Sequence, residues 1–274
     1  MRIVHTLADL RQQLLPFRHP AVVPTMGNLH AGHLALVQAA KPLGDVMVAT
    51  IFVNRLQFGP KEDFDNYPRT LQADCAQLEA AGCDLLFAPS EEELYPQPQG
   101  FTVHPDPALA DILEGQYRPG FFTGVCTVVL KLLACTQARS ALFGKKDYQQ
   151  LLIIRQMVRQ FALPVDVIGQ DTHREVDGLA MSSRNSYLST AERAQAALLG
   201  HTLQQCADAV RGGNTAFADL ENHALQTLRD AGWMPDYVAI RRQSDLQAAQ
   251  PGVPLVVLGA ARLGTTRLID NLEI

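Results

Sequence analysis

Residues 21–53 read AVVPTMGNLHAGHLALVQAAKPLGDVMVATIFV, and the order of segments in this stretch indicates the class of fold. The apolar run Ala21–Pro24 predicts a short strand that ends in a loop, and Leu34–Leu43 predicts a helix that Pro42 must end. Val46–Val53 is a continuous apolar run rich in β-branched residues, typical of a strand buried on both faces of a parallel sheet. A strand, a helix and a second buried strand in this order favour an α/β fold.

The same alternation continues through the first two thirds of the chain. The expected helices cover Thr70–Ala81, Thr123–Gln137 and Asp147–Phe161. The expected strands cover Asp84–Ala88, Ser140–Phe143 and Val165–Ile168. Because alternating strands and helices are joined by right-handed crossovers, this part of the chain is expected to form one parallel sheet covered by helices.

The pattern changes after about residue 172. Thr190–Arg211 and Thr215–Asp230 predict two long helices, and strands are expected at Asp236–Arg241 and Pro254–Leu258. We therefore expect two domains, a parallel α/β domain over residues 1–172 and a smaller α+β domain over residues 173–274.

The composition restricts the functional classes. Of the 274 residues, 47% are hydrophobic and 19% are charged, which is ordinary for a globular protein with a buried core. The formal net charge of −5 argues against a nucleic-acid partner bound by bulk electrostatics. No apolar run approaches about 18 residues, and the initial MRIVHTLADLRQQ lacks the apolar segment of a secretory signal. We therefore expect no membrane partner and a cytoplasmic location.

The chain has five cysteines, an odd number, and no C-x-x-C motif. This usage is typical of reduced, mostly buried thiols in a reducing compartment. A disulfide framework or a zinc site is disfavoured.

The segment PTMGNLHAGH, residues 24–33, is the strongest functional signal in the chain. It follows a short strand and opens a helix, which is where a parallel sheet binds nucleotides. Gly27 and Gly32 leave room for the backbone to approach a ligand. His30 and His33 share one face of the helical turn and can donate hydrogen bonds to phosphate oxygens, more strongly when protonated.

Two histidines alone would also fit a structural pair or half of a metal site. A metal site needs a third ligand, which the sequence does not offer here, so we expect no metal held by these side chains. Between a strand and a helix, and with two glycines, the pair predicts contact with nucleotide phosphates. His30-Ala31-Gly32-His33 resembles the H-x-G-H signature of the adenylate-forming nucleotidyltransferase superfamily, whose members add a second, mobile phosphate-binding segment.

Two further segments carry phosphate-binding chemistry. MSSRN, residues 181–185, offers two hydroxyls and a guanidinium, although alone it equally fits a polar turn before a helix that Ser189 caps. FGKKDYQQ, residues 143–150, follows a strand and starts a helix that Asp147 is expected to cap. Its lysines can hold a phosphate as point charges, or can be an ordinary surface pair.

The segment VNRLQFG, residues 53–59, lies just past the second buried strand. Amides of Asn54 and Gln57 can hydrogen-bond hydroxyl and carboxylate groups of a small polar substrate. They can equally cap the end of the strand, and this segment alone does not separate the two interpretations.

In order and spacing, these segments resemble the pantoate–β-alanine ligase (pantothenate synthetase) family, from about residue 3 to residue 272. Leu113–Gly115, Arg118–Val125 and Arg267–Asn271 resemble it too. The resemblance implies a Rossmann-like N-terminal domain, a smaller C-terminal lid domain and a homodimer. It also implies ATP-dependent condensation of (R)-pantoate with β-alanine to pantothenate, AMP and pyrophosphate through a pantoyl adenylate, with Mg²⁺ accompanying the ATP.

The resemblance further implies the site residues. Gln57 and Gln150 are expected to hold pantoate, with Gln57 also near β-alanine. The family assigns His33 as a proton donor, but an attacking carboxylate needs no general base. We therefore interpret the catalytic groups as stabilisers of phosphate charge, and they are His33, His30, Lys146 and Arg184. The expected ATP-binding residues are Met26, Gly27, Asn28, Leu29, His30, Ala31, Gly32, His33, Gly144, Lys145, Lys146, Asp147, His173, Met181, Ser182, Ser183 and Arg184.

Two positions depart from the family pattern. Arg55 stands where proline is usual, and His173, expected near adenine, stands where an aliphatic residue is usual. Two other functions stay open. A nucleotidyltransferase without a ligation step would not need Gln57 and Gln150 together, and an ATP-binding regulatory module would form no AMP.

Overall fold

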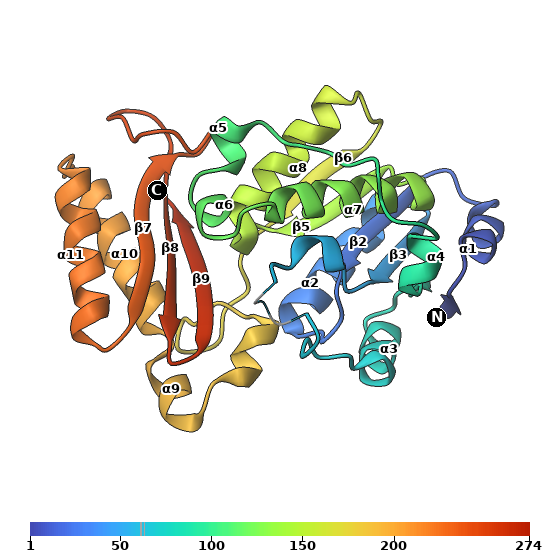
Figure 1. The fold of residues 1–274 in the computed structure, drawn as a ribbon, viewed down its shortest axis with the longest axis horizontal. Helices are drawn as coiled ribbons and strands as arrows, with labels where there is room; N and C mark the ends of the chain where they lie inside the picture. Colours follow the sequence, from blue (N-terminus) through green and yellow to red (C-terminus); the bar gives the residue numbers. More distant parts are fainter. Residues whose placement is uncertain (61, 63) are drawn as a thin grey trace.

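The computed structural model describes residues 1–60, 62 and 64–274. Their first part contains a six-stranded parallel sheet in the order β1-β4-β3-β2-β5-β6 (Figure 1). Its strands are β1 Arg2–Val4, β2 Pro20–Thr25, β3 Val46–Ile51, β4 Leu85–Phe87, β5 Ser140–Gly144 and β6 Asp166–Gln170. The expected parallel sheet is confirmed, and β1 is a strand that the sequence had not predicted.

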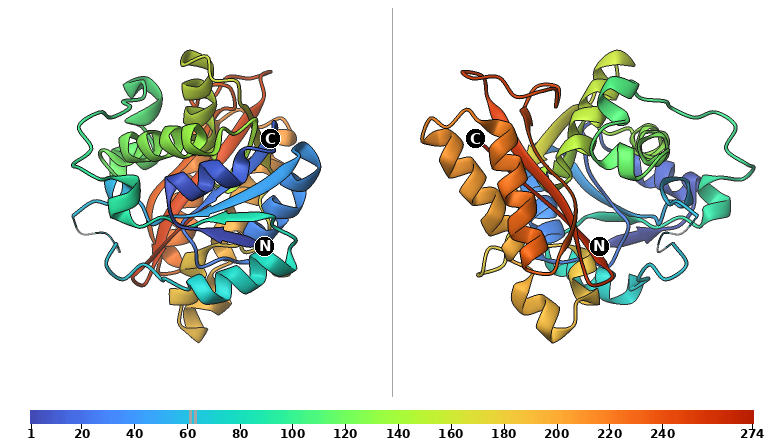
Figure 2. Two further views of the ribbon diagram at one scale, coloured as in Figure 1. Left: turned by 90° about the vertical axis from the view of Figure 1, so that its right-hand side faces the viewer. Right: turned by 60° about the vertical axis from the view of Figure 1, so that its left-hand side comes forward.

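Helices cover both faces of this sheet (Figure 2). They are α1 Leu7–Leu14, α2 Ala31–Ala40, α3 Leu71–Ala80, α4 Glu91–Leu94, α5 Pro107–Ala110, α6 Glu114–Tyr117, α7 Phe121–Thr136 and α8 Tyr148–Gln160. Alternate residues of the central strands pack to opposite sides. Val22 and Val48 join the core formed with α1, α7 and α8, whereas Val23 and Ala49 join the core formed with α2 and α3. Burial on both faces explains why these strands are continuous apolar runs.

The second part is a smaller antiparallel sheet with the order β7-β8-β9, and two long helices pack against it (Figures 1 and 2). Its elements are α9 Thr190–Gln195, α10 Leu198–Arg211, α11 Phe217–Asp230, β7 Met234–Arg242, β8 Leu255–Leu263 and β9 Thr266–Glu273. The expectation of one helix over Thr190–Arg211 is wrong, because α9 and α10 are separate helices. The interruption falls at Ala196 and Ala197, which are buried in the core of this part.

The parallel sheet ends with β6 and the antiparallel sheet begins with β7, and helices α9 to α11 lie between them in the chain. The division at residue 172 stays a prediction. No helix in the described part of the chain is long and apolar enough to cross a membrane.

The order of the strands reverses beside β2. The chain runs from β2 to β3 and β4 on one side, and later to β5 and β6 on the other. Open α/β sheets bind ligands at such a switch point, outside the carboxyl ends of the strands. The loops that leave β2 and β5 are therefore where a ligand is expected, and they carry His30 and Lys146.

Candidate active site

The loop after β2 brings the two histidines together at the start of α2. His30 is the N-cap residue, and its Nδ1 accepts a hydrogen bond from Gly32 N (3.2 Å), while His33 Nδ1 accepts one from His30 N (3.3 Å). The two ring centroids lie 4.0 Å apart. Because each Nδ1 accepts an N–H, each neutral ring carries its proton on Nε2. The Nε2–H groups are then the atoms left to donate to a ligand.

Both histidines are neutral at pH 7. Burial lowers the pKa of His30 to about 3, helped by the neighbouring ring of His33 and the ammonium of Lys146. Burial and the same ammonium lower the pKa of His33 to about 4. The stronger hydrogen bonds to phosphate that protonated rings would make are therefore not offered before a ligand binds. The negative charge of a bound ligand would raise both pKa values.

Asp74 on α3 fixes the same loop, although no motif in the sequence pointed to it. Its carboxylate is 1% exposed and accepts hydrogen bonds from Asn28 N (3.0 Å), Leu29 N (2.8 Å) and the Thr70 hydroxyl (3.0 Å). Gly27 has a φ of +81°, and a Cβ there would lie 3.0 Å from Asp74 Oδ2. The loop conformation and Asp74 therefore require this glycine, rather than room for a ligand.

The segment of residues 181–185, here called the serine segment, lies directly against residues 24–33, here called the histidine loop. Ser183 Oγ donates to Asn28 O (3.0 Å), and Asn28 Nδ2 donates to Ser183 O (3.4 Å), across 155 positions of the sequence. Met181 N donates to His173 O (2.9 Å), which joins this segment to the residue expected near adenine. As expected, Ser189 caps α9. The two segments form one continuous wall.

The turn after β5 carries two lysines that point in different directions. Lys146 lines a cavity beside the histidines, whereas Lys145 Nζ pairs with Asp171 (2.8 Å) and Glu273 (2.8 Å). These two carboxylates raise the pKa of Lys145. The expectation that the Asp147 side chain caps α8 is wrong, because within the described residues it makes no capping hydrogen bond. A 3₁₀ turn precedes the helix, and the Asp147 side chain lines the cavity.

A chain of side chains holds Gln57 at another wall of the cavity. The Tyr95 hydroxyl donates to Asn54 Oδ1 (3.0 Å), and Asn54 Nδ2 donates to Gln57 Oε1 (3.1 Å) and Gly124 O (3.1 Å). Since Oε1 is occupied, Gln57 offers its Nε2, which lies 3.3 Å from Met26 Sδ. Asn54 is 1% exposed and lines neither cavity described below. Its role is to orient Gln57.

Arg55 lies outside this arrangement. Its Nε pairs with Glu91 (3.1 Å), its guanidinium stacks 3.9 Å from the centre of the Phe64 ring, and its side chain is 57% exposed. Arg55 therefore does not add a cation to the cavity.

The segments surround two adjoining cavities, of about 240 and 270 Å³, that share several lining residues. Many predicted site residues line them: Met26, His30, Gly32, His33, Gln57, Gly144, Lys146, Asp147, Gln150, His173, Met181, Ser182, Ser183 and Arg184. The other predicted residues build the loops behind the lining: Gly27, Asn28, Leu29, Ala31 and Lys145.

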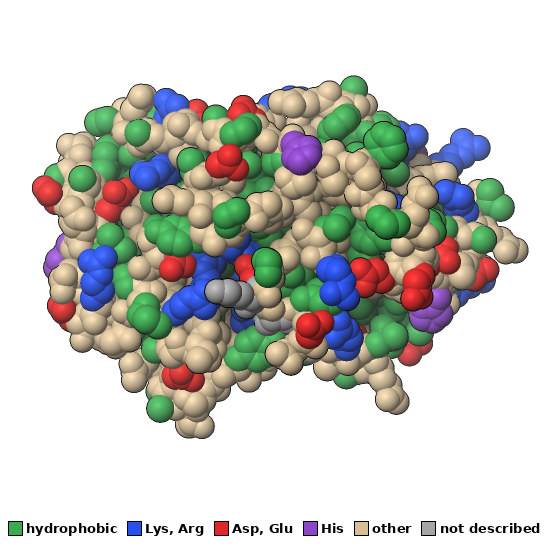
Figure 3. Space-filling view, in the orientation of Figure 1, with side chains coloured by type: hydrophobic (Ala, Val, Ile, Leu, Met, Phe, Trp, Pro, Cys, Tyr) green, Lys and Arg blue, Asp and Glu red, His purple; other side chains and the backbone are tan. Residues whose placement is uncertain are grey.

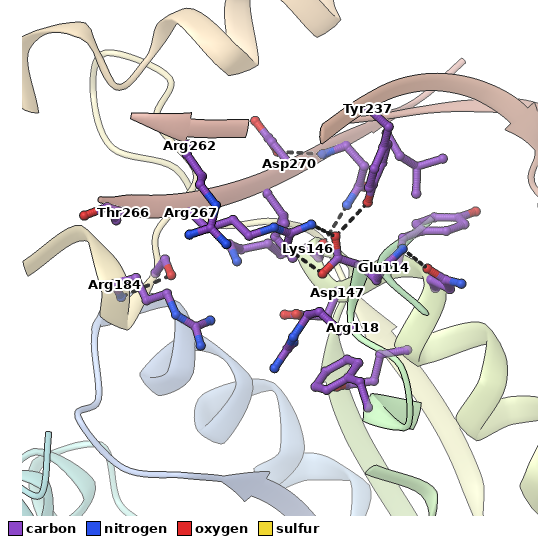
Figure 4. A pocket seen from close by; sticks show the side chains of 18 of the residues that line it. Glu114, Arg118, Lys146, Asp147, Arg184, Tyr237, Arg262, Thr266, Arg267 and Asp270 are labelled. Carbon is purple, nitrogen blue, oxygen red and sulfur yellow. Dashed lines mark hydrogen bonds and ion pairs between the residues drawn. The ribbon is translucent and has the colours of Figure 1, made fainter. Parts of the chain in front are cut away.

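The larger cavity lies between the two parts of the molecule and is rich in arginine. Lys and Arg side chains gather there on the surface (Figure 3), and Arg118, Arg184 and Arg262 extend into one space (Figure 4). Arg118 makes two hydrogen bonds to Glu62, of 2.7 and 2.8 Å. Burial acts to raise the pKa of Glu62, but the guanidinium of Arg118 holds it below its usual value. This space favours anionic ligands. Arg118 lies in a segment that resembles the family, but the sequence alone indicated no role for it.

The thiols take no part in the site. All five cysteines are free, and none of them lines either cavity. Burial raises the pKa of Cys83 to about 11 and that of Cys126 to about 12, so both stay protonated at neutral pH. Among residues 1–60, 62 and 64–274, no cluster of three or more His, Cys, Asp or Glu is placed to hold a metal ion.

The strand order and the paired histidine donors at the head of α2 define the class: an α/β protein with a cleft for nucleotide phosphates. The chain belongs to the pantoate–β-alanine ligase family, whose model matches residues 2–273. It is 63% identical to the pantothenate synthetase of Verminephrobacter eiseniae over the full length of both chains.

Two solved structures are similar over nearly their whole length. Pantothenate synthetase from Thermus thermophilus has a TM-score of 0.95 and 45% identity, covering 100% of this chain and 99% of that one. The ligase from Francisella tularensis, complexed with β-γ ATP and β-alanine, has a TM-score of 0.84 and 33% identity, covering 100% and 97%.

Proposed function

We propose that this chain condenses (R)-pantoate with β-alanine, using ATP, to give pantothenate, AMP and pyrophosphate. The observation that carries the proposal is the meeting of two kinds of group in one cleft. Side chains that can donate hydrogen bonds to phosphate, those of His30, His33 and Lys146, line the same space as the amides of Gln57 and Gln150. The first set fits a polyphosphate, and the second fits a small acid with hydroxyl groups.

ATP is proposed to lie along the wall formed by the histidine loop and the serine segment. The Nε2–H donors of His30 and His33 would face its phosphates at the start of α2. Lys146 and Arg184 add positive charge from two other segments. His173 and Met181 lie on the same wall, where the adenine is proposed to bind.

Pantoate is proposed to bind against Gln57 and Gln150. Its carboxylate attacks the α-phosphorus of ATP, the bond from that phosphorus to the bridging oxygen breaks, and pyrophosphate leaves with the electron pair. The attacking group is already an anion, so this step needs no general base. The residues act by aligning the carboxylate and by neutralising charge on the pyrophosphate.

In the second step the amine of β-alanine attacks the acyl carbon of the pantoyl adenylate. AMP leaves, and the nitrogen loses a proton as the amide forms. Gln57 is proposed to contact β-alanine as well as pantoate, in keeping with the family resemblance and with its place in the lining of the cavity. No thiol or hydroxyl nucleophile is required, in keeping with the protonated, buried cysteines.

Mg²⁺ is proposed to enter with ATP. This ion is commonly held by phosphates, waters and one or two carboxylates. Asp147 fits such a role, because its side chain lines the cavity beside Lys146 and does not cap α8. When bound, the ion would neutralise charge on the phosphates.

The test is to incubate the purified protein with Mg-ATP, (R)-pantoate and β-alanine, and to measure AMP and pantothenate, with each substrate omitted in turn. Equal amounts of AMP and pantothenate are expected. AMP formed with pantoate but without pantothenate would retain the adenylation step and refute the ligation. Folded protein that binds ATP and forms no AMP would favour the regulatory module instead.

We further propose a homodimer in the cytoplasm. The family resemblance supports the dimer, and five free thiols fit a reducing compartment. Light scattering at several protein concentrations tests the first, with a mass equal to one chain contradicting it. Cell fractionation tests the second.

A further inference from the structure

The motif Arg267–Asn271 lies in β9 of the second part, and nothing above gives it a role. Its side chains reach elements of the first part. Arg267 makes two hydrogen bonds of 2.8 Å to Glu114, with Tyr237 donating to the same carboxylate (2.9 Å; Figure 4). The Asp270 carboxylate accepts two hydrogen bonds, of 2.7 and 2.9 Å, from Arg174 in the segment that follows β6. Strand β9 is therefore fixed against the segments around the cleft.

Asn271 reaches the turn that carries Lys146. The Asn271 side chain is part of a residue that is only 5% exposed, and its Nδ2 donates to Lys145 O (2.9 Å) and Lys146 O (2.8 Å). An amide NH₂ group has two N–H donors, so both are committed to these consecutive carbonyls. The amide therefore fixes the planes of the two peptide groups that follow Lys145 and Lys146.

Asn271 is itself held firmly. Its backbone N donates to Asp270 Oδ1 (2.8 Å), and Arg174 donates to its carbonyl (3.2 Å). Glu273, two residues further along β9, binds Lys145 Nζ (2.8 Å) and the Tyr148 hydroxyl (3.2 Å). Glu273 thus contacts side chains on either side of Lys146, whereas Asn271 contacts the backbone at Lys146 itself.

We propose that Asn271 is a positioning residue, which sets the direction of the Lys146 side chain from the other part of the molecule. The inference rests on the proposed function, because Lys146 must act on the ATP phosphates. A 3₁₀ turn between a strand and a helix has few hydrogen bonds of its own to fix a long side chain. The two donated hydrogen bonds supply what the turn lacks.

The test is a double-mutant cycle with Asn271→Ala, Lys146→Ala and the double variant. The measured quantities are kcat and KM for ATP, with melting curves to check folding. Asn271→Ala is expected to lower kcat about 10- to 100-fold, the cost of a catalytic group displaced by about 1 Å. In the Lys146→Ala background the same change is expected to lower kcat less than about twofold, because the group that it positions is gone.

Two further variants complete the design. Glu273→Gln, a matched change on the same strand, is expected to retain kcat, because the Lys145 side chain lies outside the cavity lining. Asn271→Ser keeps one donor and is expected to give an intermediate kcat, and it replaces Asn271→Ala in the cycle if that variant does not fold.

The outcomes separate this inference from the proposed function. Equal losses of kcat in both backgrounds, or an equal loss from Glu273→Gln, would overturn the positioning role while leaving Lys146 in place. Near-normal turnover of Lys146→Ala would refute the phosphate role of Lys146 and so contradict the proposed site itself.

Discussion

Two turns of this molecule face the same cleft but are held in different ways. The histidine loop after β2 is held by a capping box within α2, by the carboxylate of Asp74 on α3 and by a hydrogen bond from Ser183. In the lysine turn after β5, the backbone at Lys146 is held by Asn271 of β9, which lies 125 positions away in the chain. The histidine pair is thus oriented by its own capping box, which leaves a compact signature in the sequence, whereas the backbone at Lys146 depends on a remote strand.

The largest effect is expected from removing one of the two hydrogen-bond donors of the histidine loop. His33→Ala should lower kcat about 100- to 1000-fold, the usual cost of removing one preorganised donor. The measurement is steady-state formation of AMP at saturating substrates. Turnover near the wild-type value with unchanged affinity for ATP would contradict the phosphate role of His33.

A change at Gln57 extends the comparison to a third wall of the cleft, which lies outside both turns and is held by Asn54. Gln57→Ala should lower kcat/KM for pantoate about 10- to 100-fold, because a hydrogen bond to a charged group is lost. KM for ATP should stay the same. Tyr95→Phe, which removes only the hydroxyl that orients Asn54, should act in the same direction and less strongly. A defect confined to ATP would contradict the assignment.

A smaller effect is expected from loosening the histidine loop while keeping its histidines. Asp74→Asn leaves one oxygen to accept hydrogen bonds from two backbone N–H groups, so KM for ATP should rise about 5- to 10-fold. Asp84→Asn is the matched control, because Asp84 also accepts from a backbone N–H, that of Met47 (2.9 Å), but away from the cleft. If both variants changed KM equally, the local hold on the loop would be refuted.

The last prediction concerns the stability of the fold rather than turnover, and its dependence on pH. The pKa of His30 and that of His33 lie at about 3 and 4 in the folded protein, below the ordinary value of 6.5. Below pH 6.5 the unfolded chain therefore binds protons that the folded protein does not, and the free energy of unfolding falls as the pH drops from 6.5 towards 4. Above pH 6.5 the two groups contribute nothing.

Denaturant unfolding at several pH values measures this fall. The double variant His30→Gln, His33→Gln should lose less stability over the same range, by about 3 kcal/mol per histidine. Equal slopes for the variant and the parent protein would show that the buried rings are not the source.

Much of the fold could be predicted from the sequence. Strands β2 and β3 are buried on both faces, so their apolar runs were continuous and easily assigned. Strand β9 was missed because Arg267, Asp270 and Asn271 interrupt its apolar pattern. Those polar residues are explained only by their contacts with Glu114, Arg174 and the lysine turn. The break between α9 and α10 likewise depends on packing in the core, not on a local stop signal.

The candidate site was predicted unevenly. The histidine loop, the serine segment and Gln57 lie in short motifs, and the structure brings them to one cavity. Asp74 has no such signal, because an aspartate within a helix is ordinary until the fold sets it beside the loop. The direction of Lys145 was equally invisible, since its partners, Asp171 and Glu273, lie in other elements.

The reach of β9 across the molecule has a consequence for how the protein is made. Ribosomes release a chain from its N-terminus, and domains generally fold in that order. The parallel sheet, with both phosphate turns, has emerged once residue 170 is free, but Asn271 follows about a hundred residues later. The nascent chain therefore contains the histidine loop and the lysine turn well before the residue that holds the backbone at Lys146, and the cleft is complete only once β9 has been made.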